Sequence, residues 1–482
     1  MGVKRRKPAV QDDSYMYERI AERITTMIRK GTYRTGERIP SVRNLSIQLK
    51  VSISTVVKAY FHLENRGLIE ARPQSGYYVR HQPAQSAIEP EHVLAPAIPT
   101  LVSVNDLVMM VMRDARNPAL VPLGLAAPNP DNLPVDKLNR ILSNVARRNR
   151  DQGISYDFPP GCERLRVQLA QRALRTGCSL TPDQIVTTSG CLEAVLLSLK
   201  VVCRPGDTVA IETPIFYNLL QVIETLGLKA LEIPTHPVTG MSLSALRYAL
   251  DQTTVHACLA IPNYNNPLGS CMPDEKKMEL VKLLAKHNIP LIENDVYGDL
   301  GFSSARARIS KSYDKKGLVI HCSSFSKTLA PGYRVGWVVG GRFQEKIERM
   351  KAVSNIATAT LPQLAIAEFL ATGGYDQYLR KIRGIYGRQT SLMAQAVSRS
   401  FPRGTKVSSP QGGFVLWVEM PEVVDSIKLY ELALRAGITI APGRIFSASM
   451  KYPNFIRLNS AFWSKEIEDA IAVIGSLAKG IM

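Results

Sequence analysis

Long apolar runs and paired cysteines are both missing from this chain of 482 residues. No stretch approaches the ~18 apolar residues of a membrane span. The basic run at 4–7 is followed by Gln11, Asp12 and Asp13, where a signal peptide would need apolar residues. The seven cysteines are scattered and contain no C-x-x-C pair, which argues against a disulfide framework and a zinc site. We therefore expect a cytoplasmic protein with no membrane segment and no metal.

Acidic residues are scarce, with 41 Asp+Glu against 60 Lys+Arg and a formal net charge of +19. The excess is uneven, because residues 1–80 hold sixteen Lys+Arg against seven Asp+Glu, a net of +9. A polyanionic partner for this end is one interpretation, and a solvated basic N-terminus is the other. The apolar content of 45% and the length favour a folded small module followed by a large domain.

The first 80 residues have the pattern of three short helices and a hairpin. Helical spacing of apolar residues predicts helices over 17–28, 40–49 and 54–67, and alternation predicts a hairpin over 68–79. In such an arrangement one helix enters the DNA major groove while the hairpin rests on the backbone. The candidate contacts are hydroxyl, amide or basic side chains: Arg43, Ser52, Ser54, Thr55, Lys58, Arg72 and Gln74. Helix capping explains the hydroxyls equally well.

This segment resembles the GntR family of winged-helix regulators. The stretches that carry the resemblance are GERIPSVR at 36–43, VSISTV at 51–56 and ENRGLI at 64–69. The resemblance implies a DNA-binding domain over residues 15–80, preceded by a basic tail over 1–14. The family often has a basic residue where this chain has Ile53, so a base preference cannot be carried over.

A proline-rich linker and a large α/β domain are predicted beyond residue 80. Residues 81–115 form the linker and connecting segment, and residues 116–482 form the domain. Strand-like runs at 208–211, 257–261, 290–292 and 318–321 alternate with helical stretches such as 273–285, which predicts a largely parallel sheet. From about residue 400 the pattern indicates a smaller α/β subdomain.

The segment SSFSKTLAPGYRVGW at 323–337 is the most informative part of this domain. Lys327 follows an apolar strand, with hydroxyls before it and an arginine seven residues later. Such a lysine suits imine formation with an aldehyde cofactor, while Ser324 and Arg334 suit its phosphate. A lone lysine would more often lie on the surface, and the flanking pattern reverses that preference.

Four further segments fit the same cofactor. In IENDVY at 292–297, Asp295 follows a buried strand and could hold a pyridine nitrogen protonated, although a cap or turn role is equally open. Tyr297 and Asn266 could bind a phenolic oxygen. The strand–glycine–helix pattern TTSGCLEA at 187–194 offers amides to a phosphate. Phe216 could stack on the ring, with Tyr217 and a core role as alternatives. Arg457, inside the apolar strand FIRLN, could bind a ligand carboxylate.

Together these residues resemble the fold-type I aminotransferases over about residues 120–480, which implies pyridoxal 5′-phosphate (PLP) as the cofactor. Carried over by position, Lys327 is the Schiff-base lysine and Arg457 the carboxylate anchor. Asp295 is the partner of the ring nitrogen, and Tyr156 in SYDFPPG reaches the phosphate of a neighbouring subunit, which implies a homodimer. The remaining positions implied to contact PLP are Gly190, Cys191, Phe216, Asn266, Tyr297, Ser324 and Arg334. Cys191 replaces a hydroxyl or small residue, which leaves only its backbone contact implied.

A GntR-type head joined to such a body resembles the MocR subfamily of regulators. The first hypothesis is a regulator that binds an operator in double-stranded DNA and senses an amine or amino acid by imine exchange at Lys327. A working aminotransferase that carries a DNA-binding head is the second, and a regulator with an inert dimerisation body is the third. Lys327, Asp295 and Arg457 in register argue against the third.

Overall fold

The computed structural model describes residues 16–29, 32–33, 37–65, 68–72, 76–79, 98–303 and 305–482. The chain divides into two compact units, residues 1–85 and 86–482. Within the described ranges, none of the helices has the length and apolar character needed to cross a membrane. The boundaries at residues 14, 80 and 115 stay predictions.

The first unit has three helices and a hairpin, in the order expected from the sequence. Its elements are α1 (Met16–Arg29), α2 (Val42–Leu49), α3 (Ile53–Asn65) and the antiparallel strands β1 (Ile69–Arg72) and β2 (Gly76–Val79). Ile20, Leu45, Val56 and Leu63 meet in one apolar core. The buried Tyr60 hydroxyl donates to the Pro40 carbonyl at 2.6 Å, which ties α3 to the start of α2.

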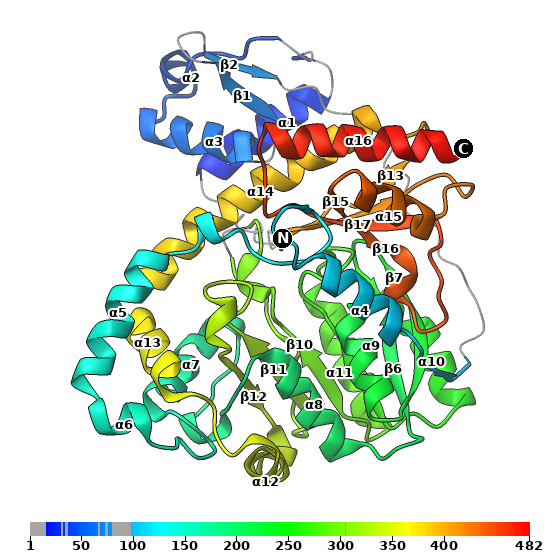
Figure 1. The fold of residues 1–482 in the computed structure, drawn as a ribbon. Coiled ribbons are helices and arrows are strands. Elements are labelled where there is room, and N and C mark those ends of the chain that lie inside the picture. The colour runs from blue at the N-terminus through cyan, green and yellow to red at the C-terminus, as the bar shows by residue number, and fades with distance from the viewer. Residues whose placement is uncertain are drawn as a thin grey trace, which may run out of the picture. The chain divides into compact units, whose positions relative to one another are not determined.

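The second unit is built on a mainly parallel sheet, as predicted (Figure 1). The strand order is β3-β7-β6-β9-β10-β11-β12-β5, with β8 paired to β7. Strands β7, β6, β9, β10 and β11 run parallel to one another, and the pairs that they form with β3, β8 and β12 are antiparallel. The bounds are β3 (Thr100–Leu101), β5 (Val186–Thr188), β6 (Thr208–Thr213), β7 (Lys229–His236), β8 (Gly240–Met241), β9 (Ala257–Ala260), β10 (Leu291–Asn294), β11 (Val319–Ser324) and β12 (Gly336–Val339).

Helices cover both faces of this sheet, because its strands are apolar on both sides. Helices α8 and α9 pack on one face with Ile292 and Ile320, and α10 and α11 pack on the other with Leu291 and Val319. The helices of this part are α4 (Asn105–Asp114), α5 (Val135–Arg148), α6 (Arg150–Ile154), α7 (Glu163–Ala173), α8 (Cys191–Val202), α9 (Tyr217–Thr225), α10 (Leu243–Gln252), α11 (Asp274–Lys286), α12 (Gln344–Asn355), α13 (Thr360–Ala371) and α14 (Gly374–Ser400).

A smaller α/β subdomain forms the C-terminal part, as the sequence pattern indicates. Its four-stranded antiparallel sheet has the order β13-β14-β17-β16 and packs against the last two helices. The elements are β13 (Lys406–Val407), β14 (Val415–Glu419), α15 (Ser426–Arg435), β15 (Ile438–Thr439), β16 (Ala441–Pro442), β17 (Phe455–Asn459) and α16 (Lys465–Ile481). Strand β4 (Val121–Pro122) pairs with β15, so the beginning of the second unit also contacts this subdomain.

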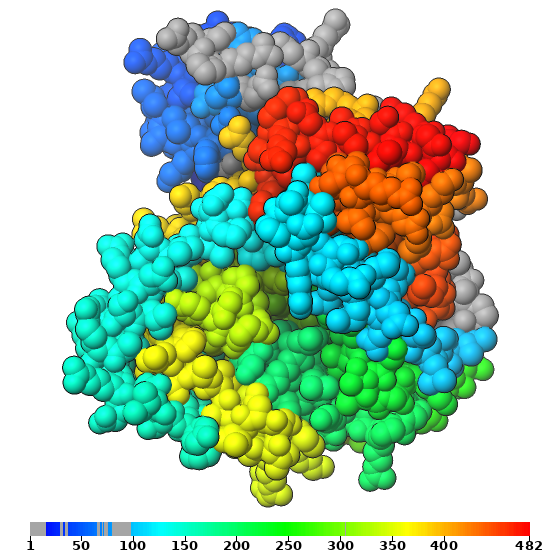
Figure 2. Space-filling model, viewed as in Figure 1, coloured from blue at the N-terminus to red at the C-terminus, as the bar shows by residue number. Residues whose placement is uncertain are grey.

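The surface of the second unit is hollowed between its cyan N-terminal segment and the green to yellow-green segments (Figure 2). The same segments meet inside, where the residues after β4 contact the turn after β11. The carboxyl ends of the parallel strands lie at this place, which is where open α/β sheets bind ligands.

Candidate functional site

Lys327 lies in the turn after β11 and its amine is held inside the protein. The Nζ atom donates to the Ala126 carbonyl at 2.6 Å. Burial lowers the pKa of Lys327 to about 8, and the positive charges of Arg457 and Arg334 add to this effect. An amine with so low a pKa is partly neutral near physiological pH, which is the form that attacks an aldehyde.

The residues predicted for a phosphate surround the first turn of α8. Gly190 precedes this helix at φ 91°, and a Cβ atom there would lie 2.5 Å from Arg334 Nη2. Arg334 donates to the Ser189 carbonyl at 3.0 Å and to Ser326 Oγ at 3.2 Å. The buried Ser324 hydroxyl accepts from the Ser326 amide at 3.3 Å. A helix N-terminus, a guanidinium and hydroxyls thus converge as phosphate donors do.

Asn266, Tyr297 and Arg457 form a buried polar chain. The Asn266 amide nitrogen donates to the Tyr297 hydroxyl at 3.3 Å, and Arg457 donates to Asn266 Oδ1 at 3.4 Å. Burial raises the pKa of Tyr297, so its hydroxyl keeps its proton and can donate. The loop that carries Asn266 is held by Glu212, which accepts from Asn265 at 2.8 Å and from the Ile261 amide at 2.7 Å.

The two aromatic candidates for ring stacking differ in environment. Tyr217 is buried beside Phe446 and near the Arg457 guanidinium, whereas Phe216, at the start of α9, is only partly buried. Their rings lie 4.8 Å apart. Phe216 is therefore the more accessible of the two rings, and its stacking role stays a prediction.

Arg457 is a fully buried guanidinium without an acidic partner among the described residues. One nitrogen donates to the Gly124 carbonyl and another to Asn266, while Nε has no hydrogen-bond partner in the same part of the chain. The rings of Tyr217 and Phe446 lie 5.7 and 5.3 Å from it. A buried charge normally has a counter-charge. This site therefore suits a ligand that brings a carboxylate.

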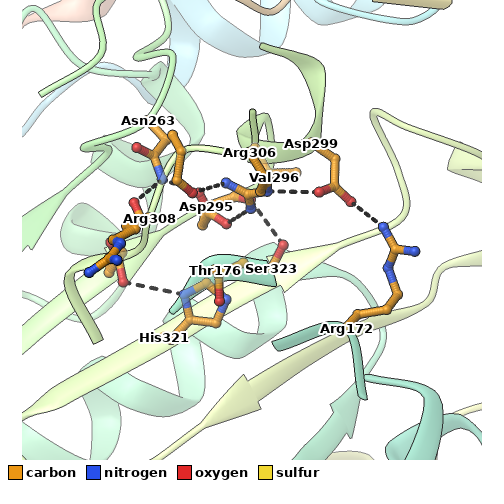
Figure 3. Close-up of polar contacts among 12 residues, drawn as sticks. Arg172, Thr176, Asn263, Asp295, Val296, Asp299, Arg306, Arg308, His321 and Ser323 are labelled. Atoms are coloured by element: carbon orange, nitrogen blue, oxygen red, sulfur yellow. Dashed lines mark hydrogen bonds and ion pairs between the residues drawn. The ribbon is translucent and has the colours of Figure 1, made fainter. Parts of the chain in front are cut away.

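Asp295 has partners other than the one predicted from the sequence (Figure 3). One oxygen accepts from Asn263 at 2.9 Å and the other is bound by Arg306, which also bonds Asp299 at 2.7 Å. Asp299 in turn lies 3.6 Å from Arg172. The carboxylate expected to pair with a ring nitrogen is thus already neutralised by an arginine whose side chain is 11% exposed.

Sequence reasoning missed a backbone segment and this arginine. The carbonyls of Gly124, Ala126 and Ala127 accept from Arg457, Lys327 and Asn459, so one loop after β4 holds three side chains of the site. Small residues in a loop carry no chemical signal that could have marked them. Arg306 was equally hidden, because its partners are reached only through the fold.

Of the two remaining predicted contacts, Tyr156 lies outside this buried cluster and Cys191 lies at its edge, at the start of α8. Tyr156 follows α6 and is 70% exposed, with its ring 5.6 Å from that of the exposed Phe158. An exposed pair of this kind suits a residue intended for a neighbouring subunit. Cys191 is buried at the start of α8, where burial raises its pKa, and its thiol donates to Asn294 Oδ1 at 3.4 Å.

Most of the head residues predicted to contact DNA lie on α2, α3 and β1, and Ser52 directly precedes α3. Arg43 and Lys58 are exposed. Ser52 caps α3 by accepting from the Thr55 amide at 3.1 Å, and its hydroxyl also bonds Ser54 and Thr55 at 2.9 and 2.7 Å. Capping therefore accounts for Ser52, and its DNA contact stays a prediction. Arg72 ends β1, and Gln74 lies outside the described residues.

Two family models match the chain. The aminotransferase class I and II model matches residues 128–474, and the model of the bacterial regulatory proteins of the gntR family matches residues 16–79. The chain belongs to the aminotransferase class I and II family and carries a GntR-type head. This combination confirms the resemblance to MocR-type regulators, and the protein is a DNA-binding regulator with an aminotransferase-like PLP domain.

Two regulators are similar to this chain over nearly its whole length, and an aminotransferase structure is similar to most of it. The uncharacterized HTH-type transcriptional regulator YdcR of Escherichia coli is 39% identical over 96% of this chain and 98% of its own length. The HTH-type transcriptional regulator NorG of Staphylococcus aureus is 28% identical over 92% of this chain and 100% of its own. Kynurenine aminotransferase from Pyrococcus horikoshii has a TM-score of 0.73, with 28% identity, 78% of this chain and 94% of that chain covered.

The family implies PLP as the cofactor, and the described residues fit it. Three observations match three parts of PLP. The lowered pKa of Lys327 suits the aldehyde, and the cradle between Gly190 and Arg334 suits the phosphate. The Asn266–Tyr297 pair suits the phenolic oxygen. PLP supplies an aldehyde and an electron-withdrawing ring to an amine substrate.

Proposed function

We propose that this protein is a transcription regulator whose PLP-loaded body detects an amino acid by amine exchange at Lys327. The observation that carries the proposal is the buried Arg457, which has no acidic partner among the described residues and whose charge is felt at Lys327. A ligand with both an amino group and a carboxylate satisfies both side chains at once. A simple amine would leave the guanidinium unpaired.

The proposal includes a homodimer that binds an operator in double-stranded DNA in the cytoplasm. Exposed Tyr156 supports the dimer, since its predicted partner is the phosphate site of the neighbouring subunit. A working aminotransferase is the alternative function, supported by the same lysine and arginine. The two functions differ in whether an added amino acid is converted or only bound.

An absorbance spectrum of the purified protein with each candidate amino acid tests the proposal. We expect an absorption band near the visible edge that shifts when one of the amino acids is added. That amino acid should remain chemically unchanged, and the DNA affinity should change at the same ligand concentration. A protein that cannot be reconstituted with PLP would contradict the proposal and favour an inert dimerisation body.

Uptake of PLP by the cofactor-free protein should depend on pH through Lys327. The neutral amine is the nucleophile and its pKa is about 8. The uptake rate should therefore rise about tenfold per pH unit well below that value and level off above it. Stopped-flow absorbance between mildly acidic and mildly alkaline pH measures the profile. A rate that keeps rising towards the ordinary pKa of lysine would contradict the assigned environment.

Replacement of Arg43 by alanine should weaken operator binding and flatten its salt dependence. Arg43 is an exposed cation on α2, and each lost phosphate contact reduces the slope of log K against log salt by about one. Fluorescence anisotropy at several salt concentrations measures the slope. Arg23→Ala, which removes an exposed charge from α1, is the matched control and should leave the slope unchanged. Equal slopes in all three proteins would show that Arg43 does not contact DNA.

A further inference from the structure

Asn294 and Asp295 are neighbours at the end of β10, and their side chains point to opposite faces of the sheet, as alternation along a strand requires. Asn294 pairs in register with Cys322, whose sulfur lies 3.5 Å from Ser198 Oγ on α8. Asn294 Oδ1 accepts from Cys191 Sγ at the start of the same helix. Asp295 instead joins Asn263 and Arg306, in the cluster shown in Figure 3.

The substituents of PLP indicate which of the two faces the ring nitrogen. The aldehyde carbon lies between the phosphate arm and the phenolic oxygen, and the nitrogen lies across the ring from it. With the aldehyde at Lys327, the phosphate at α8 and the phenolic oxygen at Tyr297, the nitrogen would lie between α8 and Tyr297. Of the two neighbours, Asn294 is the one on this side, because its Oδ1 contacts Cys191 at the start of α8, whereas Asp295 is bound by Arg306.

The orientation of the Asn294 amide follows from its contacts. The Val296 backbone N–H donates to Oδ1 at 3.3 Å, so this atom must be the oxygen. The amide nitrogen has no hydrogen-bond partner in the described part of the chain, and the side chain is only 5% exposed. The group left for a ring nitrogen is therefore a neutral N–H donor.

We propose that Asn294, and not Asp295, faces the ring nitrogen of PLP and keeps it unprotonated, so that the body binds amino acids with little conversion. This inference rests on the proposed function and deepens it. An N–H donor bonds the lone pair of an unprotonated nitrogen, whereas a carboxylate stabilises the protonated form. An unprotonated ring withdraws electrons weakly, which slows loss of the Cα proton from a bound amino acid. An amide at position 294, in place of a carboxylate, thus lets the protein bind an amino acid with little conversion of it.

Nuclear magnetic resonance of the protein loaded with PLP labelled at the ring nitrogen tests the inference directly. We expect the shift of an unprotonated nitrogen in the native protein and in Asp295→Asn, and that of a protonated nitrogen in Asn294→Asp. Asn288→Asp, the same change at an exposed position, should match the native protein. A protonated nitrogen in the native protein would overturn the inference even if Asp295→Asn fails to fold.

Conversion of the bound amino acid provides a second readout. In that reaction the Cα proton moves to the aldehyde carbon and water releases an oxo acid, leaving pyridoxamine phosphate. We expect Asn294→Asp to raise the single-turnover rate by at least about tenfold. An unchanged rate together with a protonated nitrogen in the native protein would assign the role to Asp295. Failure of the native protein to bind any PLP would overturn the proposed function as well, whereas a protonated nitrogen overturns only the inference.

Discussion

Replacement of Lys327 by alanine is expected to abolish the visible absorption band and the response to amino acids while leaving operator binding in place. Lys327 is the side chain whose amine has a pKa of about 8 and a position inside the cluster of candidate ligands. Without it, no covalent link to PLP forms and an incoming amine has nothing to exchange with. The head has its own apolar core and does not need this lysine to fold.

Operator affinity with and without amino acid, measured beside the absorbance spectrum, checks this prediction. The matched control is Lys346→Ala, an exposed lysine on α12, which should keep both the band and the response. A normal ligand response in Lys327→Ala would contradict sensing at this residue. Loss of operator binding without ligand would instead mean that the cofactor supports the dimer.

Replacement of Arg457 by methionine is expected to lower the affinity for amino acids about 30-fold to several thousand-fold, the range that 2–5 kcal/mol spans. The guanidinium is buried and has no acidic partner among the described residues, so a bound carboxylate would supply its counter-charge. An amine without a carboxylate should bind the variant as well as it binds the native protein. Titration of the absorption band with an amino acid and with its decarboxylated amine separates the two cases.

The same variant should shift the pH profile of PLP uptake. The charge of Arg457 contributes to the low pKa of Lys327, so its removal raises that pKa and moves the profile to higher pH. Arg457→Lys should keep the profile, since it keeps the charge. Arg444→Met serves as the control, because Arg444 pairs with Asp425 in the same subdomain.

In the affinity measurement, an equal loss for the amino acid and for its decarboxylated amine in Arg457→Met would show that Arg457 does not bind a carboxylate.

Local patterns were enough to predict the order of elements and the fold class. Helical spacing in residues 17–28 and continuous apolar runs such as 208–211 depend on neighbours only a few positions apart, and they correspond to α1 and β6. The lysine segment at 323–337 could be interpreted in the same way, because strand, turn and charged residues follow one another within one stretch. The family models confirm that both parts of the chain were recognised correctly.

The partners of the polar groups could not be predicted in the same way. Arg457 donates a hydrogen bond to the Gly124 carbonyl, more than 300 positions earlier in the chain, and no local pattern near either residue predicts that contact. The choice between Asn294 and Asp295 could not be made from the sequence either. Asn294 ends β10, Asp295 directly follows it, and both side chains are polar.

The sequence by itself determined that a DNA-binding head precedes a PLP body, and it predicted Lys327 as the reactive lysine, because these features depend on short stretches of chain. Only the tertiary structure decided which residue faces α8 and which lies beside Arg306, and that Arg457 has no acidic partner among the described residues. The physical reason is that strand alternation separates neighbours onto two faces, while burial in a folded core brings distant charges within bonding distance.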